Sequence, residues 1–563
     1  TDIYTTAPGF YVWGRALTVA FAMATIWLTY RVGRRRFGPA AGLIAAATLA
    51  ALPFHVRHSQ YITTDIASGF TALLAVWAAL RVLDEGSWRR YAVAGLAVGL
   101  AAGTKYNAAM VAGAVATAHA LHWRGSSLRE AGRLILAGLA SALGFLLTTP
   151  TIIPHFDEFT RDMRRQLESY GGGHGDAIGR WPIGEYLDFL WWDGLRIAPL
   201  LAALAGLAWI VRRRHPAGLV TVGFVLPYGL FVLSQQTHFF RNLLPVFPLA
   251  ALWAGAGLQA AAAWLGERRP AWRPALAAAG LAALTLAYPL AKAVEISRFE
   301  AFPNSKVLAD DYIRDVLPRG LPVMAEVLPA RWGGSTSVLP SADIAAHGAA
   351  WYQSQGVRYV VANEYNRQRD GQAAYAALAA GARLVQHFPG NDQGRPGPEI
   401  AVYDLGLDPG QLPLTAAPAT FGSGLALLGY AWSVGEPRPT LTPLQPAGDL
   451  RSGQPLRLNL YWRVDQPLDR DYSLFVHVLD ESGQTVAQRD SVIRQGDYPT
   501  SRWKPGEIVL DMPDLPLPAL PPGRYGVKIG LYDLATFARL PVSGSGDATA
   551  DSALMLFSLD IRP

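Results

Sequence analysis

The stretch GRALTVAFAMATIWLTYRVGRRRFG at residues 14–38 joins a long apolar run to a cluster of arginines. A helix needs about 17 to 25 mostly apolar residues to cross the roughly 30 Å hydrocarbon core of a bilayer. The run therefore predicts a transmembrane helix. Its arginines predict a cytoplasmic end, because short cytoplasmic loops collect Lys and Arg.

Comparable apolar runs recur through the first half of the chain. We expect ten membrane segments, at residues 10–30, 37–56, 65–83, 90–104, 106–122, 133–153, 194–211, 216–234, 242–266 and 273–293. Lys105 divides one continuous apolar stretch into the fourth and fifth segments. These two halves are either two short spans or a re-entrant pair.

Loop charge tests this count and gives the orientation. Alternate loops carry sixteen arginines, within residues 31–36, 81–90, 124–133, 212–214 and 268–273. The intervening short loops carry only three basic residues, Arg57, Lys105 and Arg241. The positive-inside rule therefore predicts a multi-pass protein of the cytoplasmic membrane. The loops at 54–65, 154–193 and 235–241, and everything after residue 293, are expected outside the cytoplasm.

Composition excludes several classes of protein. The 563 residues include 16% charged and 51% hydrophobic side chains, whereas soluble domains average roughly 25% charged. The chain has no cysteine, which excludes a disulfide scaffold, a thiolate metal site and a cysteine nucleophile. It has no phosphate-binding GxxxxGK[ST] loop, no HExxH and no GxSxG. The net charge of +6 is explained by the cytoplasmic arginines, so no nucleic-acid partner is expected.

The second half of the chain has the pattern of soluble protein. After a membrane domain at residues 1–293, residues 299–405 show short apolar runs separated by Ala-rich stretches, which predicts a small α/β domain. Residues 415–563 alternate with period two in LRLNLYWRV, YSLFVHVLD and RYGVKIGLYD, which predicts a β-sandwich. The fold class is therefore a polytopic helical membrane domain followed by an α/β domain and a β-sandwich.

The long outer loop at 154–193 begins with an amphipathic pattern. Phe156, Phe159, Met163 and Leu167 share one helical face, and the segment ends in a glycine-rich turn. We expect a helix that lies in the membrane interface, followed by a mobile loop. Its interleaved acidic and basic residues are expected to form a solvated face.

The stretch FHVRHSQYITTDIASGF at 54–70 is the first candidate for chemistry. Four polar side chains crowd the loop: His55, Arg57, His58 and Tyr61. Arg57 and the histidines suit an anionic phosphate. Asp65 stands where the third helix begins, so it either caps that helix or binds a divalent metal or an acceptor hydroxyl. Ionisable groups at membrane depth are costly, which favours a functional role.

Two further basic features lie on the same predicted face. Lys105 in AAGTKYNAAM either reaches the interface as a snorkelling side chain or contacts a phosphate. His238 and Arg241 in SQQTHFFRNLLPVFPLAAL stand at the entry of a long span. Arg241 either anchors the helix end or binds a phosphate through two parallel hydrogen bonds.

Four stretches in this order resemble the GT-C class of membrane glycosyltransferases. They are residues 14–38, HSQYITTDIASGF at 58–70, GLAVGLAAGTKYNAAM at 95–110 and HFFRNLLPVFPLAAL at 238–252. The resemblance is to the protein O-mannosyltransferase-like and aminoarabinose-transferase-like group, glycosyltransferase family 39. It implies a polyprenyl-phosphate-linked sugar donor, a glycan, lipid or protein acceptor, an active site on the outer face, and transfer with inversion.

The same resemblance implies roles for individual residues. Asp65 matches the family's second acidic position, which contacts the acceptor or a metal, and Lys105 and Arg241 match positions near the lipid phosphate. The family's catalytic base lies in a first outer loop, after a first helix that this sequence is expected to lack. Asp2 is too close to the next helix to replace it. The 563-residue chain is therefore expected to be inactive alone.

YWRV, FVHVLD, YPTSRWKPGE and GLYD resemble β-sandwich domains that are appended to such enzymes. The resemblance implies saccharide or acceptor binding, with Trp462, Trp503 and Tyr532 as stacking side chains; the alternative for these aromatics is core packing. Two other functions stay open for the whole chain: a transporter or flippase of lipid-linked saccharide, and a non-catalytic scaffold of the cell envelope.

Overall fold

The computed structural model divides the chain into two compact units, Ala7–Phe299 and a second that contains Glu300–Pro563. It describes residues 8–123, 128–172, 176–268, 273–318, 320–326, 338–340, 344–363, 372–407, 410, 412–434, 450–451, 453–496, 498–544 and 547–562.

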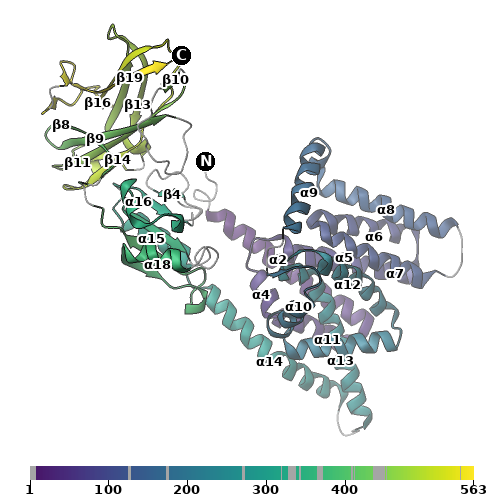
Figure 1. Cartoon of the computed structure of the whole chain (residues 1–563). Coiled ribbons are helices and arrows are strands. Elements are labelled where there is room, and N and C mark those ends of the chain that lie inside the picture. The colour runs from purple at the N-terminus through teal and green to yellow at the C-terminus, as the bar shows by residue number, and fades with distance from the viewer. Residues whose placement is uncertain are drawn as a thin grey trace. The chain divides into compact units, whose positions relative to one another are not determined.

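The first unit is a helical bundle (Figure 1). Its longer helices are α2 (Pro8–Phe37), α3 (Pro39–Ala51), α5 (Thr64–Glu85), α6 (Trp88–Thr104), α7 (Ala112–His122), α8 (Leu128–Thr148), α9 (Phe156–Gly171), α11 (Ile197–Arg212), α12 (Pro216–Ser234), α13 (Phe247–Arg268) and α14 (Pro274–Glu300). Short helices connect them: α4 (Pro53–His58), η1 (Tyr106–Val111), η2 (Pro150–Ile152), α10 (Ile183–Phe189), η3 (Leu190–Gly194) and η4 (Phe240–Val246). Strands β1 (Ala177–Ile178) and β2 (Thr237–His238) pair with each other.

Local sequence sets several of these boundaries. Pro39 and Pro216 begin α3 and α12, where a proline costs no helical hydrogen bond. Gly86 ends α5 in the left-handed conformation, with φ of 59°. These signals place the breaks between helices close to the predicted ends of the apolar runs.

Each of the ten predicted membrane segments falls on one helix or on two consecutive ones, as residues 37–56 do on α3 and α4. Among the described residues, six helical stretches are long and apolar enough to cross a membrane; they include α2, α5, α8, α12, α13 and α14. A seventh results if Ile183–Gly194 and Ile197–Arg212, which meet at 117°, form one bent span. The chain is thus a multi-span membrane protein, and the count of ten crossings stays a prediction.

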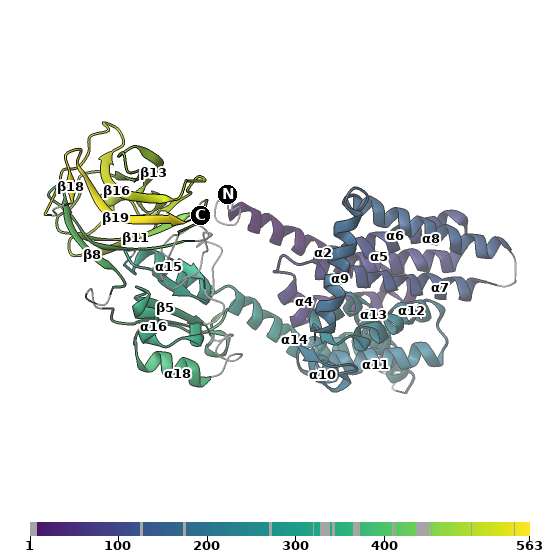
Figure 2. The ribbon, with the colours of Figure 1, turned by 45° about the horizontal axis from the view of Figure 1, so that its top comes forward.

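The pair α6 and α8 is packed through glycines. Gly95, Gly99 and Gly103 recur every fourth residue on α6, and an added Cβ on any of them would overlap α8, at Ala137 O, Ser141 O and Thr148 Oγ1 respectively. The two helices lie side by side in both ribbon views (Figures 1 and 2). Small residues allow such close approach where lipid provides no hydrophobic drive between helices.

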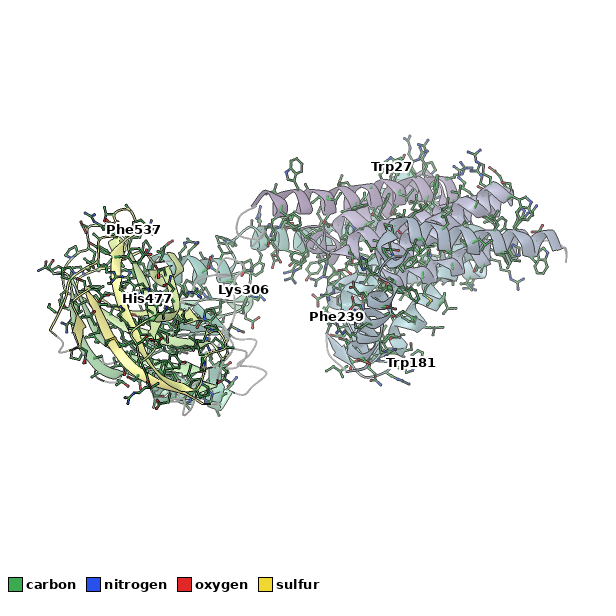
Figure 3. The ribbon with its side chains drawn as sticks, turned by 90° about the horizontal axis from the view of Figure 1, so that it is seen from above. Trp27, Trp181, Phe239, Lys306, His477 and Phe537 are labelled. Carbon is green, nitrogen blue, oxygen red and sulfur yellow. The ribbon has the colours of Figure 1, made fainter. Side chains whose placement is uncertain are left out.

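The outward surface of the bundle is apolar. Trp27 on α2 is 59% exposed and Leu284 on α14 is 80% exposed, and Figure 3 labels Trp27 on the rim of the unit. Exposed apolar patches of this extent are not expected in a soluble protein. They fit contact with lipid.

The second unit begins with an α/β domain, as predicted. Its five-stranded sheet has the order β4-β3-β5-β7-β6. The strands are β3 (Val323–Ala325), β4 (Val338–Pro340), β5 (Tyr359–Asn363), β6 (Arg383–Phe388) and β7 (Ile400–Asp404), and the helices are α15 (Ser305–Asp315), α16 (Ala349–Ser354) and α18 (Gln372–Ala380). Strand β3 runs parallel to β4 and β5, whereas β7 is antiparallel to its neighbours.

The rest of the second unit is the predicted β-sandwich (Figure 2). One sheet has the order β14-β11-β9-β8-β17, with β8 (Thr415–Phe421), β9 (Leu425–Val434), β11 (Leu456–Val464), β14 (Ile508–Asp511) and β17 (Val542–Ser543). The other has the order β10-β19-β16-β12-β13, with β10 (Leu450–Arg451), β12 (Tyr472–Leu479), β13 (Thr485–Val492), β16 (Gly523–Asp533) and β19 (Ala553–Arg562). The core between them takes alternate residues of each strand, such as Leu474, Val476 and Val478 of β12.

The α/β domain and the sandwich are joined tightly within this unit. The amide N–H of Leu510 donates to the carbonyl of Gly320 at 2.8 Å. A Cβ on Gly320 would overlap the carbonyl oxygen of Ile508, so the two backbones meet where only glycine fits. Leu321, Tyr461 and Leu510 are buried in one apolar cluster at the same junction.

Candidate functional site

The ammonium group of Lys105 is held by two acceptors inside the first unit. Lys105 Nζ lies 2.6 Å from Asp65 Oδ1 and 2.7 Å from Asn242 Oδ1. The Asp65 side chain is 4% exposed and that of Lys105 is 20% exposed. A buried carboxylate is costly unless it is paired, so each charge compensates for the desolvation of the other.

Breaks between helices bring these three side chains together. Lys105 is the extended residue that ends α6, with φ of −156° and ψ of 123°, before η1 begins. Asp65 lies in the first turn of α5, and Asn242 lies in η4. Thr63, not Asp65, is the N-cap of α5, and the structure gives no side-chain capping hydrogen bond there; the charge of Asp65 in the first turn still suits the positive end of the helix, beside its ion pair with Lys105.

Asn242 was not predicted from the sequence. Its side-chain oxygen accepts from Lys105, and its backbone carbonyl accepts from the hydroxyl of Tyr228 on α12 at 2.5 Å. Both residues are buried. The available signal was a neutral amide within the apolar run FFRNLL, next to the more conspicuous Arg241.

His58 lies in a field of four charged groups. The charges of Asp65, Arg57, Arg241 and Asp176 all act on its ring, and burial lowers its pKa to about 4. The ring is therefore neutral at pH 7. Its Nδ1 is buried and has no hydrogen-bond partner among the described residues. A buried polar atom without a partner is uncommon, and a ligand is one explanation for it.

Arg57 and Arg241 are the two cations beside His58. Arg57 donates from Nε to the hydroxyl of Tyr61 at 2.9 Å. The guanidinium carbon of Arg241 lies 4.4 Å from the ring centre of Phe239, and the residue is exposed. Within the described residues, no ion pair neutralises Arg241.

His238 is placed differently from the other predicted phosphate contacts. It is fully buried, and its Nε2 lies 2.8 Å from the carbonyl oxygen of Gly179 and 2.9 Å from that of Gln235. Its Nδ1 lies 3.2 Å from the hydroxyl of Tyr186. Both ring nitrogens thus have protein partners, and the side chain ties the outer loop to β2.

The outer loop is anchored beside Arg241. The Asp176 carboxylate accepts from the amide N–H of Phe240 at 2.7 Å, and the β1–β2 pairing lies next to it. Helix α9 carries no buried residue, and Phe156 and Leu167 of its apolar face are exposed. The helix is therefore amphipathic, as a helix that lies in the membrane interface must be. Residues 173–175 of the predicted mobile loop lie outside the described residues.

The predicted metal contact of Asp65 gains no support from its surroundings. In the described part of the chain, no group of three or more His, Asp or Glu side chains could hold a metal ion. The nearest partner of the Asp65 carboxylate is a cation, Lys105. No step of the reaction is therefore assigned to a metal ion at Asp65.

The structure corrects two of the three predicted stacking aromatics. Trp462 and Trp503 are buried in the core between the sheets, so neither ring offers a face to a saccharide. Period-two alternation along β11 places Trp462 inward, and Trp503 follows the short helix Thr500–Arg502; core packing therefore holds for both. Tyr532 is only 8% exposed and is stacked by Phe537, which is 73% exposed and is labelled on the outside of the sandwich in Figure 3.

Comparisons with solved structures give distant similarities. ArnT from Cupriavidus metallidurans in the apo state is 15% identical, with a TM-score of 0.45 over 72% of this chain and 87% of that one. Its complex with undecaprenyl phosphate is 16% identical, with a TM-score of 0.44 over 71% and 87%. The arabinofuranosyltransferase AftD from Mycobacteria is 14% identical, with a TM-score of 0.35 over 98% and 54%. These values are too low to carry an argument about chemistry.

Comparison with protein families is more informative. No curated protein matches the chain. Residues 11–153, which contain Asp65 and Lys105, match the family described as dolichyl-phosphate-mannose-protein mannosyltransferase, and this match confirms the predicted resemblance to the GT-C membrane glycosyltransferases over that segment.

Proposed function

We propose that this protein transfers a sugar from a polyprenyl-phosphate-linked donor to an acceptor at the outer face of the membrane, with inversion at the anomeric carbon. The observation that carries the proposal is the buried contact of Lys105 with Asp65 and Asn242, in the segment that matches the mannosyltransferase family and in the structure around it. A lipid donor explains why charged groups collect among membrane helices.

The chemistry places demands on the cations. The donor's phosphate is the leaving group and gains negative charge as the glycosidic bond to it breaks. Fixed positive charge next to that oxygen stabilises the transition state. Lys105 is positioned for this role, while Arg241 and Arg57 bind the remaining phosphate oxygens and neutral His58 supplies a hydrogen bond. His238 acts on this site indirectly, because it orients the segment that carries Arg241.

Asp65 has two functions in this proposal. It holds Lys105 in place and offsets its charge before the donor arrives. Once Lys105 contacts the phosphate, the carboxylate is available to orient the hydroxyl of the acceptor, which attacks from the side of the sugar opposite the phosphate. Attack from that side inverts the anomeric carbon: the new carbon–oxygen bond forms as the bond to the phosphate breaks, the polyprenyl phosphate leaves, and the proton of the hydroxyl passes to the base that the family resemblance implies.

The test is transfer from a synthetic polyprenyl-phosphate sugar by the full-length protein in lipid nanodiscs, with mass detection of the glycosidic product. We expect Lys105→Ala and Asp65→Asn each to lower turnover at least tenfold. Lys292→Ala is the matched control, because Lys292 pairs with Glu295 on α14, away from this network. Normal turnover in both site variants would overturn the assignment. Movement of lipid-linked sugar across vesicles without a new glycosidic bond would favour a flippase.

A further inference from the structure

A cavity of about 700 Å³ lies inside the second unit, at the junction of the α/β domain with the sandwich. Its walls come from the end of α15 and the residues after it, from the start of β5, and from the segment that leads into β14. Ligand pockets usually measure about 300 to 1,000 Å³ and are common between domains. The close backbone contact of Gly320 with Ile508 fixes the two sides relative to each other.

One wall of the cavity is the sequence YPTSRWKPGE at residues 498–507, one of the stretches that resemble appended β-sandwich domains. Trp503 is buried, and its indole N–H donates to the carbonyl of Tyr498 at 2.9 Å. The hydroxyl of Tyr498 donates to Glu507 Oε2 at 2.7 Å, and the amide N–H of Lys504 donates to the same oxygen at 3.1 Å. These bonds close the segment on itself, so it is rigid before any ligand binds.

Arg502 and Lys504 flank the buried Trp503 and line the cavity. Both residues are exposed, and among the described residues neither side chain has an ion pair or a hydrogen bond. The basic residues of the opposite wall are compensated: Arg314 contacts Asp311 at 2.7 Å, and Arg358 contacts Asp404 at 3.2 Å. The cations of the cavity without an ion-pair partner are therefore Arg502 and Lys504, and the Glu507 carboxylate, which accepts from Tyr498 and from the Lys504 amide, offsets part of their charge on the same wall.

The remainder of the lining is largely apolar. Leu317, Leu407, Leu412 and Ile508 contribute aliphatic surface, and Tyr359 contributes an aromatic ring. Such a lining suits the C–H face of a sugar ring, while guanidinium and ammonium groups suit a carboxylate or a phosphate ester. The two kinds of surface meet in one cavity.

We propose that this cavity binds an acidic saccharide, whose carboxylate or phosphate contacts Arg502 and Lys504 and whose ring lies against the aliphatic wall. The choice of a saccharide rests on the proposed function, because a glycosyltransferase acts on saccharide-bearing molecules. The acidic group follows from the unpaired cations alone.

The experiment is calorimetric titration of the full chain in detergent, without any lipid donor. The probes are a hyaluronan tetrasaccharide, which carries glucuronate; chitotetraose, its neutral counterpart; mannose 6-phosphate; and inorganic phosphate. We expect the glucuronate probe, the sugar phosphate or both to bind at least tenfold more tightly than chitotetraose. The double variant Arg502→Gln, Lys504→Gln should weaken that binding at least tenfold, and Arg524→Gln, an exposed sandwich arginine that does not line the cavity, should not.

The outcomes separate the two proposals. The glucuronate and phosphate probes show which acid is recognised. Equal affinity for inorganic phosphate, equal affinity of the double variant, or binding of no acidic probe would overturn the inference. The melting temperature of the double variant is compared with that of Arg524→Gln to show that the fold is retained. Because no donor is present, loss of sugar transfer with binding intact would contradict only the proposed function, and the reverse result only this inference.

Discussion

Lys105 Nζ and Asp65 Oδ1 lie 2.6 Å apart, although forty residues and most of two helices separate them in sequence. The contact pairs the end of α6 with the beginning of α5. A buried carboxylate is costly unless it is paired, and the Asp65 side chain, which is 4% exposed, is paired with the ammonium group of Lys105. It also means that the two residues depend on each other for stability.

A double-mutant cycle measures that dependence. Removing one partner of a buried ion pair costs about 3 to 5 kcal/mol, and the partial exposure of Lys105 places the expected loss near the lower figure. Asp65→Asn and Lys105→Gln should each lower the thermal stability of the purified protein. The double variant should lose much less than the sum of the two single losses. Strict additivity would show that the pair contributes no coupling.

Asn242 should act as a positioning residue for Lys105. Asn242→Ala removes the second acceptor of the ammonium group, so we expect weaker donor binding and at least a tenfold fall in kcat/KM. Asn242→Ser keeps an acceptor oxygen and should recover part of the loss. Gln235→Ala on the adjoining segment is the control, since its amide contacts Phe231 O and Ser234 Oγ. An unchanged KM for the donor in Asn242→Ala would exclude the role.

Burial predicts opposite outcomes for two aromatic residues of the sandwich. Trp503→Ala empties a core position and removes a hydrogen bond to Tyr498, so a loss of about 3 to 5 kcal/mol is expected. Phe537→Ser changes a ring that is 73% exposed and should alter stability by no more than about 0.5 kcal/mol. Thermal unfolding of the purified variants compares the two. A large effect at Phe537 would contradict the assigned packing.

The absence of cysteine makes the predicted orientation simple to test. Single cysteines at Ser501, in the sandwich, and at Arg213, between α11 and α12, give two unique labelling sites. A membrane-impermeant maleimide added to intact cells should label Ser501→Cys and should reach Arg213→Cys only after lysis. The opposite pattern would reverse the orientation and exclude an active site on the outer face.

The glycine contact between α6 and α8 should not tolerate a side chain. A Cβ on Gly99 would overlap the carbonyl oxygen of Ser141, so Gly99→Leu forces the helices apart. We expect a marked fall in melting temperature together with loss of turnover, because Lys105 ends the same helix. Gly138→Leu on α8 is the control, since no atom lies within 4 Å of its Cβ position. Similar behaviour of both variants would contradict the contact.

Much of the fold could be predicted because its signals are local. Apolar length marked the helices, and period-two alternation marked the strands of the sandwich. Asp65 and Lys105 stood out as charges among apolar residues. Asn242 did not, because a neutral amide next to Arg241 carries no such contrast. The cavity could not be predicted, because its walls come from Arg358, Leu407 and residues 498–508, which only the folded chain brings together.

The stacking aromatics show where the resemblance and the local pattern point in different directions: the resemblance implies stacking, whereas alternation along β11 predicts core packing for Trp462. In LRLNLYWRV, strict alternation places Trp462 with Leu458 and Leu460, and all three are in the core. Residues Tyr461 and Trp462 share one strand with a register shift between them, so both sides of the strand are buried at that point. Which side chains of a strand face the core depends on such tertiary detail, which alternation alone does not supply.

The glycine seam of α6 has a mechanical consequence. Helices that touch through side chains can roll or slide as rotamers rearrange. Gly95 and Gly99 instead face backbone carbonyl oxygens of α8, which cannot move aside in that way. Turning α6 about its axis would drive Gly95, Gly99 and Gly103 out of register with α8 all at once. The helix therefore cannot rotate freely about its axis. The direction in which its last residue, next to Lys105, leaves the bundle is set by α8 rather than by the ligand.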